Sequence, residues 1–323
     1  MTFHPSGILE DQILHAASLL REGKLVAFPT ETVYGLGANA LDADAVARIF
    51  EAKGRPAHSP IIVHVSSMTM AQTVVAEWPD EADVLARAFW PGPLTLVLPK
   101  QPAVPDIVTA GLPTVGVRMP DHPVALALIE AAQVPVAAPS ANRFSMLSPT
   151  TAEHVRRSLG DRVDYILDGG ACTVGIESTV LAVGGEEPLL LRPGGISRSQ
   201  IEDLIGPISR PKEEPVEAHP SPGMHPLHYS PQTRLLLVSG GEVPISGAGA
   251  YLQLHSRPRH EVLEIVHMPS DAAGYAVQLY RVLHDLDALG YDWIAVDEPD
   301  NTAAWEAVRD RLTRARTPEA SEK

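Results

Sequence analysis

Cysteine is almost absent from this chain of 323 residues, in which Cys172 is the only one. A single cysteine cannot form an internal disulfide, and it excludes a zinc site built from several cysteines. Such a composition is typical of proteins that fold in a reducing compartment, so we expect a cytoplasmic protein. We expect Cys172, and also Trp90 in the segment WPGP, to be packing residues.

Long apolar runs are also missing. No stretch approaches the roughly 20 apolar residues that span a bilayer, and residues 1–10 lack the basic and apolar regions of a signal peptide. We therefore expect a soluble protein without a membrane anchor. The hydrophobic content of 45% still permits a substantial core, and the length favours about two domains.

Positive charge is scarce relative to negative charge, with 25 Lys and Arg against 40 Asp and Glu. The deficit is shared, because residues 1–206 hold 14 basic and 23 acidic residues and the remainder holds 11 and 17. Strong direct binding of nucleic acid is therefore not expected. Any phosphate site must be local, made from a few cations and backbone amides in a cleft. No metal site is predicted, because His225 and His228 have no carboxylate or cysteine at ligand spacing.

Proline marks a domain boundary. Residues 207–232 contain seven prolines, which predicts an extended, semi-rigid linker between a larger domain, 1–206, and a smaller one, 233–323. Strand and helix patterns alternate before the linker, which is typical of a mixed α/β sheet. The expected helices are 8–21, 42–52, 80–89, 122–132 and 151–159, the last opening on a capping box at 150–153, and the expected strands are 25–28, 60–65, 94–98, 115–118, 136–138, 165–167 and 179–183.

A second α/β pattern follows the linker. It predicts strands at 235–238, 251–254, 262–266 and 293–296 and helices at 272–289 and 302–315. The first of these helices has the residue spacing of a core-packed helix and not of a cofactor-binding segment. We therefore expect a small α/β unit with its own sheet.

Four polar segments next to buried strands are candidates for ligand binding. The segment PTETVYGLG, 29–37, offers hydroxyls, a carboxylate and two glycines, and KGRP, 53–56, offers two cations that can reach one polyanion. APSANR, 138–143, follows a strand at the end where α/β sheets bind ligands, and SPTT, 148–151, leads into a helix N-terminus that favours anions. Helix caps, turns and complementation of a helix C-terminus explain each segment equally well when it is considered alone.

Taken together, the segments resemble one family, the YrdC-type threonylcarbamoyl-AMP synthases in their long form with a C-terminal domain. The resemblance extends from about residue 10 to 316. It implies a YrdC-like twisted mixed sheet with helices, followed by a smaller Rossmann-like α/β domain. The motifs that carry it are PTETVYGLG (29–37), KGRP (53–56), IIVHV (61–65), WPGPLTLVL (90–98), VGVRMPDHP (115–123), PSAN (139–142), SPTTAEHV (148–155), VGIESTV (174–180), LRPGG (191–195), SPGM (221–224) and HYSP (228–231).

The resemblance implies a reaction without an enzyme nucleophile. L-threonine captures bicarbonate as a carbamate, and the carbamate attacks the α-phosphate of ATP to give threonylcarbamoyl-AMP and pyrophosphate. Mg²⁺ is expected on the ATP phosphates, held mainly by substrate oxygens and water. The expected partners are the downstream transferase proteins that modify ANN-decoding transfer RNAs.

The family pattern also implies the site residues. Lys53 and Arg55 are expected to act at the phosphates, and Tyr229 lies in the linker, where it acts as a lid or only packs the linker against the domain. Two departures from the family are the run 143–147 after PSAN and the segment 225–227 in the linker. The residues expected around threonine are Thr32, His64, Arg118, the backbone of Ala138, and Ser178; those around ATP are Arg55, Ser59, Thr114, Ser140, Asn142, Ser148, Arg192 and Tyr229.

Three other functions are compatible with parts of this pattern. A carbamoyl-transferring maturation factor contains the same kind of domain but needs zinc-finger cysteines. A non-catalytic nucleotide- or RNA-binding protein associated with translation needs a basic concave face, which the acidic composition opposes. A regulatory nucleotide-binding protein without turnover is separated from an enzyme only by an assay.

Overall fold

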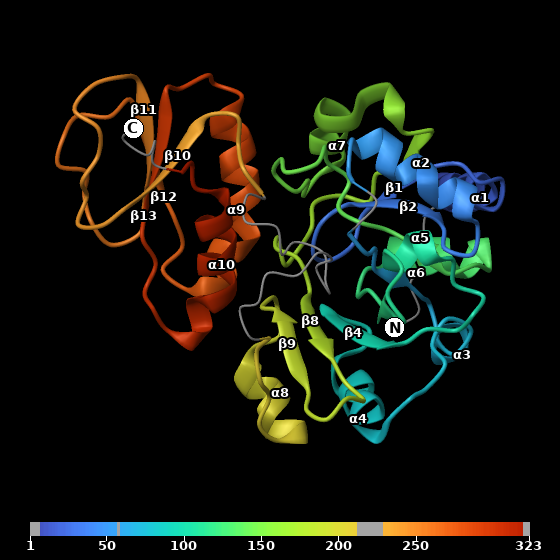
Figure 1. Cartoon of the computed structure of the whole chain (residues 1–323). Coiled ribbons are helices and arrows are strands. Elements are labelled where there is room, and N and C mark those ends of the chain that lie inside the picture. Colours follow the sequence, from blue (N-terminus) through green and yellow to red (C-terminus); the bar gives the residue numbers. More distant parts are fainter. Residues whose placement is uncertain (1–6, 57–58, 212–228, 319–323) are drawn as a thin grey trace.

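The computed structural model describes residues 7–56, 59–211 and 229–318, which form two sheets with their helices (Figure 1). The larger sheet has nine strands of mixed direction, and the smaller sheet has four parallel strands. The predicted fold class, a large mixed α/β sheet followed by a smaller α/β domain, is thereby confirmed. The predicted linker lies mostly at 212–228, outside the described residues, so its boundaries and its extended conformation stay predictions.

The nine strands of the larger sheet follow the order β7-β1-β2-β6-β3-β5-β4-β8-β9. Parallel and antiparallel neighbours alternate irregularly, with β1 antiparallel to β2 and parallel to β7. This mixture brings the ends of β2, β3, β5, β6 and β8 to one region of the sheet, although they are far apart in sequence. The strands are β1 (Val26–Phe28), β2 (Gly35–Asn39), β3 (Val63–His64), β4 (Leu94–Pro99), β5 (Thr114–Arg118), β6 (Val136–Ala137), β7 (Tyr165–Ile166), β8 (Thr179–Ala182) and β9 (Leu189–Arg192).

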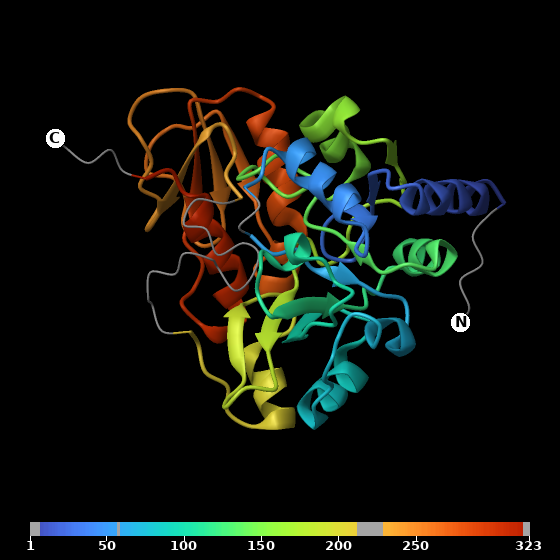
Figure 2. The same ribbon diagram turned by 45° about the vertical axis from the view of Figure 1, so that its right-hand side comes forward.

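Helices cover both faces of this sheet (Figure 2). Two of them, α1 and α6, pack against one another and against the side chains of Val26 and Phe28 on one face. The other face carries the largest core, to which α2, α4 and α7 contribute. The helices are α1 (Gly7–Arg21), α2 (Ala43–Lys53), α3 (Met68–Ala71), α4 (Asp80–Phe89), α5 (Asp106–Thr109), α6 (Pro123–Ala132), α7 (Ala152–Leu159), the 3₁₀ helix η1 (Gly160–Arg162) and α8 (Arg198–Ile205).

Helix α2 shows how local sequence sets the site. Asp42 caps its N-terminus by accepting hydrogen bonds from the amides of Asp44 and Ala45. Gly54 ends it in the left-handed conformation, with φ of 63°, which glycine adopts at little cost. The chain therefore turns sharply between Lys53 and Arg55, and the two cations point in different directions.

The capping box expected at 150–153 is absent. Thr151 is the N-cap of α7, and its hydroxyl accepts from the amide of His154, so the third helical position is a histidine and cannot reach back as a glutamate would. A true capping box occurs at α8, between Ser197 and Gln200.

Strand β2 was missed by the sequence patterns because two of its five residues are glycines. Gly37 is required by close packing, since a Cβ atom there would lie 2.8 Å from Phe28 and 2.9 Å from Val136. The expected strand at 60–65 is regular only over Val63–His64, and its neighbour Ile61 donates instead to the carbonyl of Val108.

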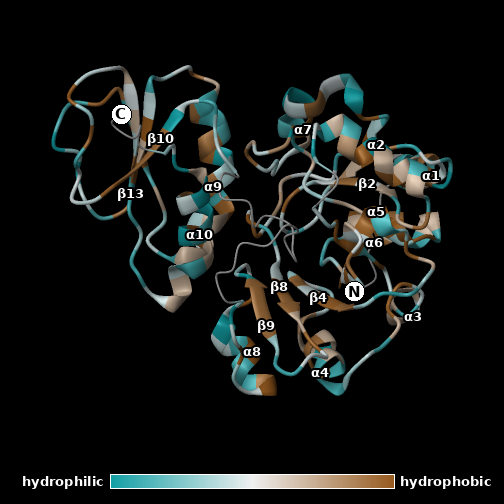
Figure 3. Ribbon diagram, in the orientation of Figure 1, coloured by the Kyte–Doolittle hydropathy of each residue, from teal (hydrophilic) through white to brown (hydrophobic). Residues whose placement is uncertain are grey.

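The smaller sheet has the order β10-β13-β11-β12, and its helices α9 and α10 pack on one of its faces. Strands β4, β8 and β9 of the larger sheet are mostly hydrophobic, whereas α7 is mostly hydrophilic (Figure 3). The elements of the smaller domain are β10 (Arg234–Val238), β11 (Gly249–Gln253), β12 (Glu264–His267), α9 (Ala272–Asp287), β13 (Trp293–Asp297), the 3₁₀ helix η2 (Ala303–Trp305) and α10 (Glu306–Ala315).

The two sheets are joined by a continuous apolar contact. Helices α9 and α10 lie between the smaller sheet and the larger domain (Figure 1). Val33, Leu147 and Ile176 of the larger domain belong to the same buried cluster as Leu279 and Leu283 of α9. Within the described ranges, no helix is long and apolar enough to cross a membrane.

Candidate active site

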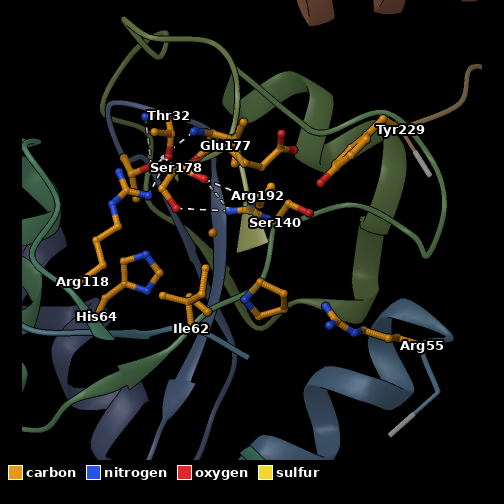
Figure 4. Close-up of a pocket in the computed structure, with 15 residues that line it drawn as sticks. Thr32, Arg55, Ile62, His64, Arg118, Ser140, Glu177, Ser178, Arg192 and Tyr229 are labelled. Carbon is orange, nitrogen blue, oxygen red and sulfur yellow. Dashed lines mark hydrogen bonds between the residues drawn. The ribbon is translucent and has the colours of Figure 1, made fainter. Parts of the chain in front are cut away.

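One polar cavity gathers most of the predicted site residues. It lies where β2, β6 and β8 begin or end, and Figure 4 shows Arg118, His64 and Thr32 on one side and Arg55 and Tyr229 on the other. Its free volume is about 50 Å³. Nine of the predicted site residues line it: Thr32, Arg55, His64, Arg118, Ala138, Ser140, Ser178, Arg192 and Tyr229.

Arg118 stands at the end of β5 with its guanidinium held on all sides. Its Nη1 donates to the hydroxyl of Thr32 at 3.0 Å, and its Nε donates to the carbonyl of Gly92 at 3.1 Å. Its Nη2 forms an ion pair with Glu31 at 2.5 Å, in which both side chains are 4% exposed. The fork expected to bind a substrate carboxylate is thus already occupied, so a carboxylate must take the place of the Thr32 hydroxyl or share the guanidinium with Glu31.

His64 is a neutral imidazole in this cavity. Burial, and then the positive charge of Arg118, lower the pKa of His64 to about 3. It therefore carries no charge at neutral pH, and it can exchange hydrogen bonds with a ligand without adding to the positive field. Its edge-to-face contact with Phe28, with ring centroids 6.1 Å apart, fixes its plane.

Arg192, at the end of β9, and Ser178, just before β8, form a second polar group. Arg192 donates from Nε and Nη2 to the carbonyl of Ser178 at 3.1 and 3.0 Å, and from Nη2 to its hydroxyl at 3.2 Å. The same hydroxyl lies 2.8 Å from the hydroxyl of Thr95. These contacts join the predicted threonine side of the cavity to its predicted ATP side.

Arg55 and Lys53 are both buried, but only Arg55 lines the cavity. Burial lowers the pKa of Arg55 to about 10, so the guanidinium stays charged at neutral pH. Its Nη2 donates to the carbonyls of Ser59 and Pro60, while its Nε has no hydrogen-bond partner among the described residues. Lys53 donates instead to the carbonyls of Ser140 and Asn142, each at 2.5 Å, and so supports the PSAN segment from behind.

Five of the predicted site residues lie outside the cavity lining: Lys53, Ser59, Thr114, Asn142 and Ser148. Thr114 lines a separate small cavity beside Ile62, and Ser148 donates its hydroxyl to Glu177 at 2.5 Å. Asn142 donates to the carbonyls of Arg143 and Met146. Their roles, like the assignment of the lining residues to threonine or ATP, stay predictions.

Tyr229 occupies the space between the cavity and the smaller domain. Its side chain is 1% exposed, and its φ of 64° is uncommon for a residue other than glycine. The ring lies against that of Tyr280, with centroids 5.9 Å apart, and under the guanidinium of Arg311. Tyr229 therefore both lines the cavity and packs against the smaller domain, and its action as a lid stays a prediction.

Two buried carboxylates belong to this region and were not assigned a role from the sequence. Glu31 pairs with Arg118, and Glu177 lines the cavity and pairs with Arg311 at 2.7 Å. The motifs that contain them were recognised, but a carboxylate is not expected in an anion site. A buried arginine needs a counter-charge, and this need could have pointed to the two glutamates. The sequence does not show which arginine each glutamate pairs with, so the need cannot be used before the structure is known.

Each of these two carboxylates faces an arginine. Within the parts of the chain that the structure describes, no group of three or more His, Cys, Asp or Glu side chains could hold a metal ion.

The cavity combines the guanidinium groups of Arg55 and Arg192 with hydroxyls and a neutral imidazole at the strand ends of an α/β sheet. This is the arrangement of a protein that binds a small polyanion next to a polar ligand. Fold and site thus define the class as an α/β protein with one small polar cavity lined by arginines and hydroxyls at its strand ends.

Comparison with known proteins specifies the family. Residues 18–194 match the family model Sua5_yciO_yrdC, described as "Telomere recombination", and residues 196–317 match the "Threonylcarbamoyl-AMP synthase, C-terminal domain". The chain is 42% identical to a threonylcarbamoyl-AMP synthase of Pyrococcus abyssi, with 95% of each chain covered. It is 43% identical to that of Bacillus subtilis, covering 95% of this chain and 93% of the relative. The chain therefore belongs to the threonylcarbamoyl-AMP synthase family, in its long form.

Solved structures agree with this membership. The Sua5 protein of P. abyssi complexed with L-threonine has a TM-score of 0.88 and 41% identity, covering 95% of this chain and 94% of that one. The YciO protein of Escherichia coli is 24% identical, with a TM-score of 0.53 over 61% of this chain, and shows the fold of the larger domain alone.

Proposed function

We propose that this protein is an L-threonylcarbamoyladenylate synthase, a nucleotidyltransferase that makes threonylcarbamoyl-AMP and pyrophosphate from L-threonine, bicarbonate and ATP. The observation that carries the proposal is the shared cavity, in which Arg118 and His64 face Arg55 and Arg192 across a single small space. Membership of the synthase family at high coverage supports the same reaction.

The chemistry requires two anions to be held in reacting contact. The amine of threonine attacks the carbon of bicarbonate, and one molecule of water is lost as the carbamate forms. A carbamate oxygen then attacks the α-phosphorus of ATP as the bond to pyrophosphate breaks. We assign Thr32, His64, Arg118, the Ala138 backbone and Ser178 to threonine. Positioning and fixed positive charge supply the catalysis, so no enzyme nucleophile is required.

We assign ATP to the opposite side of the cavity. Arg55 and Arg192 remain charged near it, and Ser140 stands at the end of β6 with its carbonyl held by Lys53. Mg²⁺ is proposed as part of the ATP substrate, where it neutralises charge on the phosphates. Since 50 Å³ is far below the several hundred Å³ of typical ligand sites, the cavity must widen for ATP, and Tyr229 is the side chain best placed to move.

We propose that the product passes to transferase proteins that modify adenosine in ANN-decoding transfer RNAs. The acidic composition of both domains opposes tight binding of transfer RNA by this chain itself. The cytoplasmic location stays a prediction from the single cysteine.

A direct assay tests the function. Purified protein is incubated with labelled bicarbonate, threonine and ATP, and pyrophosphate and a labelled threonylcarbamoyl adenylate are measured. Both should form, and both should require threonine. Nucleotide binding without any product would favour the alternative of a non-catalytic nucleotide-binding protein.

A further inference from the structure

The smaller domain reaches the cavity through one fully buried arginine. Arg311 of α10 has an exposed fraction of 0%. Its Nε donates to Glu177 at 2.7 Å, and its Nη2 donates to the carbonyl of Pro193 at 2.9 Å. A buried guanidinium carries a high desolvation cost, so contacts of this quality across a domain boundary indicate a specific role.

The partners of Arg311 are next to three residues that we assign to ATP. Glu177 accepts the hydroxyl of Ser148 at 2.5 Å, and Pro193 follows Arg192 directly in sequence. The guanidinium carbon of Arg311 also lies 5.3 Å from the centre of the Tyr229 ring, within the range of a cation–π contact. Arg311 of the smaller domain thus contacts Tyr229 directly, and it reaches Ser148 and Arg192 through its partners Glu177 and Pro193.

Charge explains why this position needs an arginine. Glu177 lines the cavity, and an uncompensated carboxylate there would repel the phosphates of ATP. Burial alone would raise the pKa of Glu177, but Arg311, Arg192 and the Ser148 hydroxyl lower it overall, so it stays ionised. Tyr280 of α9 adds a hydrogen bond to the same carboxylate at 3.1 Å.

We propose that Arg311 is a positioning residue for the ATP half of the site, which acts by neutralising and orienting Glu177. This is the contribution of the smaller domain to the reaction, and it rests on the proposed function. The nearby Asp310, which accepts from Nη1 of Arg311 at 2.6 Å and from Arg314 at 3.0 Å, keeps the guanidinium in this orientation.

The test is Arg311→Met, with Arg309→Met as the matched control. Arg309 lies on the same helix, but its guanidinium bonds to Pro299 and Glu298 within the smaller domain. Arg311→Met should raise the KM for ATP roughly tenfold or more, with the KM for threonine changed by less than about threefold, because a like charge is left facing the phosphates. Arg309→Met should leave both values within about twofold.

A second substitution separates positioning from mere stability. In Arg311→Met with Glu177→Gln, the orphaned charge is gone, so the KM for ATP should return most of the way to that of the wild type. A structural ion pair would instead show a lowered melting temperature with both KM values unchanged, which would overturn the proposal. An equal rise in the two KM values would overturn it as well.

Two milder variants keep the proposal testable if Arg311→Met does not fold. Arg311→Lys retains the charge and should raise the KM for ATP only slightly, and Tyr280→Phe removes one hydrogen bond to Glu177 without a change of charge. If both behave as wild type, the proposal fails. If the wild-type protein makes no product, the proposed function fails separately. The role of Arg311 is then tested by calorimetric titration with ATP, in which the Kd of Arg311→Met is compared with those of the wild type and of Arg309→Met.

Discussion

At the scale of residues, the arginines of the site differ in their hydrogen-bond acceptors, which are carboxylates for some and backbone carbonyls for others. Arg118 has Glu31 and Arg311 has Glu177, whereas Arg55 bonds to backbone carbonyls. A carbonyl neutralises no charge, so Arg55 keeps its full attraction for a polyanion. This difference supports the proposal that Arg55 lies on the nucleotide side, while the assignment of the two sides stays a prediction.

Arg118→Ala should raise the KM for threonine far more than the KM for ATP. The lost charge-assisted hydrogen bonds correspond to about 1.5–3 kcal/mol, or roughly 10- to 100-fold. Arg55→Ala should show the opposite preference. Steady-state kinetics with each substrate varied in turn measures both, and equal effects on the two substrates would contradict the assignment.

Arg118→Ala also leaves Glu31 as an unpaired buried charge, which should destabilise the fold by about 3–5 kcal/mol. Combining it with Glu31→Gln should recover most of that stability without restoring the affinity for threonine. Urea denaturation of the two variants separates the effect on folding from the effect on binding.

At the scale of elements, helices α7 and α9 meet through two stacked histidines. The rings of His154 and His284 lie 4.0 Å apart at an angle of 24°, and His284 contacts the carbonyl of Ser148. Burial is the largest cause that lowers the pKa of both, to about 3 for His154 and about 4 for His284. The neighbouring His284 and Arg157 lower the pKa of His154 further, and Arg157 also lowers that of His284. Both are therefore neutral in the folded protein near pH 7.

Stability should fall as the pH falls below 6.5. A histidine whose folded pKa lies below its unfolded value binds its proton preferentially in the unfolded state, so its contribution is complete above pH 6.5 and is lost toward the folded pKa. His154→Phe keeps a stacking ring without the titration. Between pH 7 and pH 5 it should lose roughly 2 kcal/mol less stability than the wild type, as measured by urea denaturation, and an identical loss would contradict this.

At the scale of the whole molecule, the two domains contact one another through backbone atoms as well as through side chains. Gly175 has φ of 80°, and a Cβ atom there would lie 2.4 Å from the carbonyl oxygen of Ala276 in α9. No side chain fits at this point without separating the domains. The glycine of the VGIESTV motif is thus explained by the interface and not by a ligand.

Gly175→Ala should destabilise the protein more than Gly170→Ala. Gly170 has a similar φ of 90° but no atom within 4 Å of a built Cβ, so it isolates the backbone strain of about 1–2 kcal/mol. The wedge at Gly175 should add roughly 1–3 kcal/mol. Thermal unfolding of both variants tests this, and equal melting temperatures would show that the domains are not held at this contact.

The sequence by itself determined most of the helices and strands, the succession of a larger and a smaller α/β unit, and most of the residues that line the cavity. Asp42 and Gly54 mark the ends of α2 by local chemistry. Seven of the nine predicted residues that line the cavity meet there because their motifs end or begin strands, and of the other two, Arg55 follows a helix and Tyr229 lies in the predicted linker. Strands β2 and β9 were not predicted. In β2 the reason is Gly37, which is explained only by its packing against Phe28 and Val136.

Only the tertiary structure decided which charged side chains are paired within the protein and which can contact a ligand. Lys53 turns to the carbonyls behind Ser140, although its spacing from Arg55 suggested that both reach one polyanion. Glu177 and Arg311 are 134 residues apart, and no local pattern relates them. Long-range pairing depends on how whole elements pack, because a buried charge is stabilised by whichever partner the fold brings within a few ångströms.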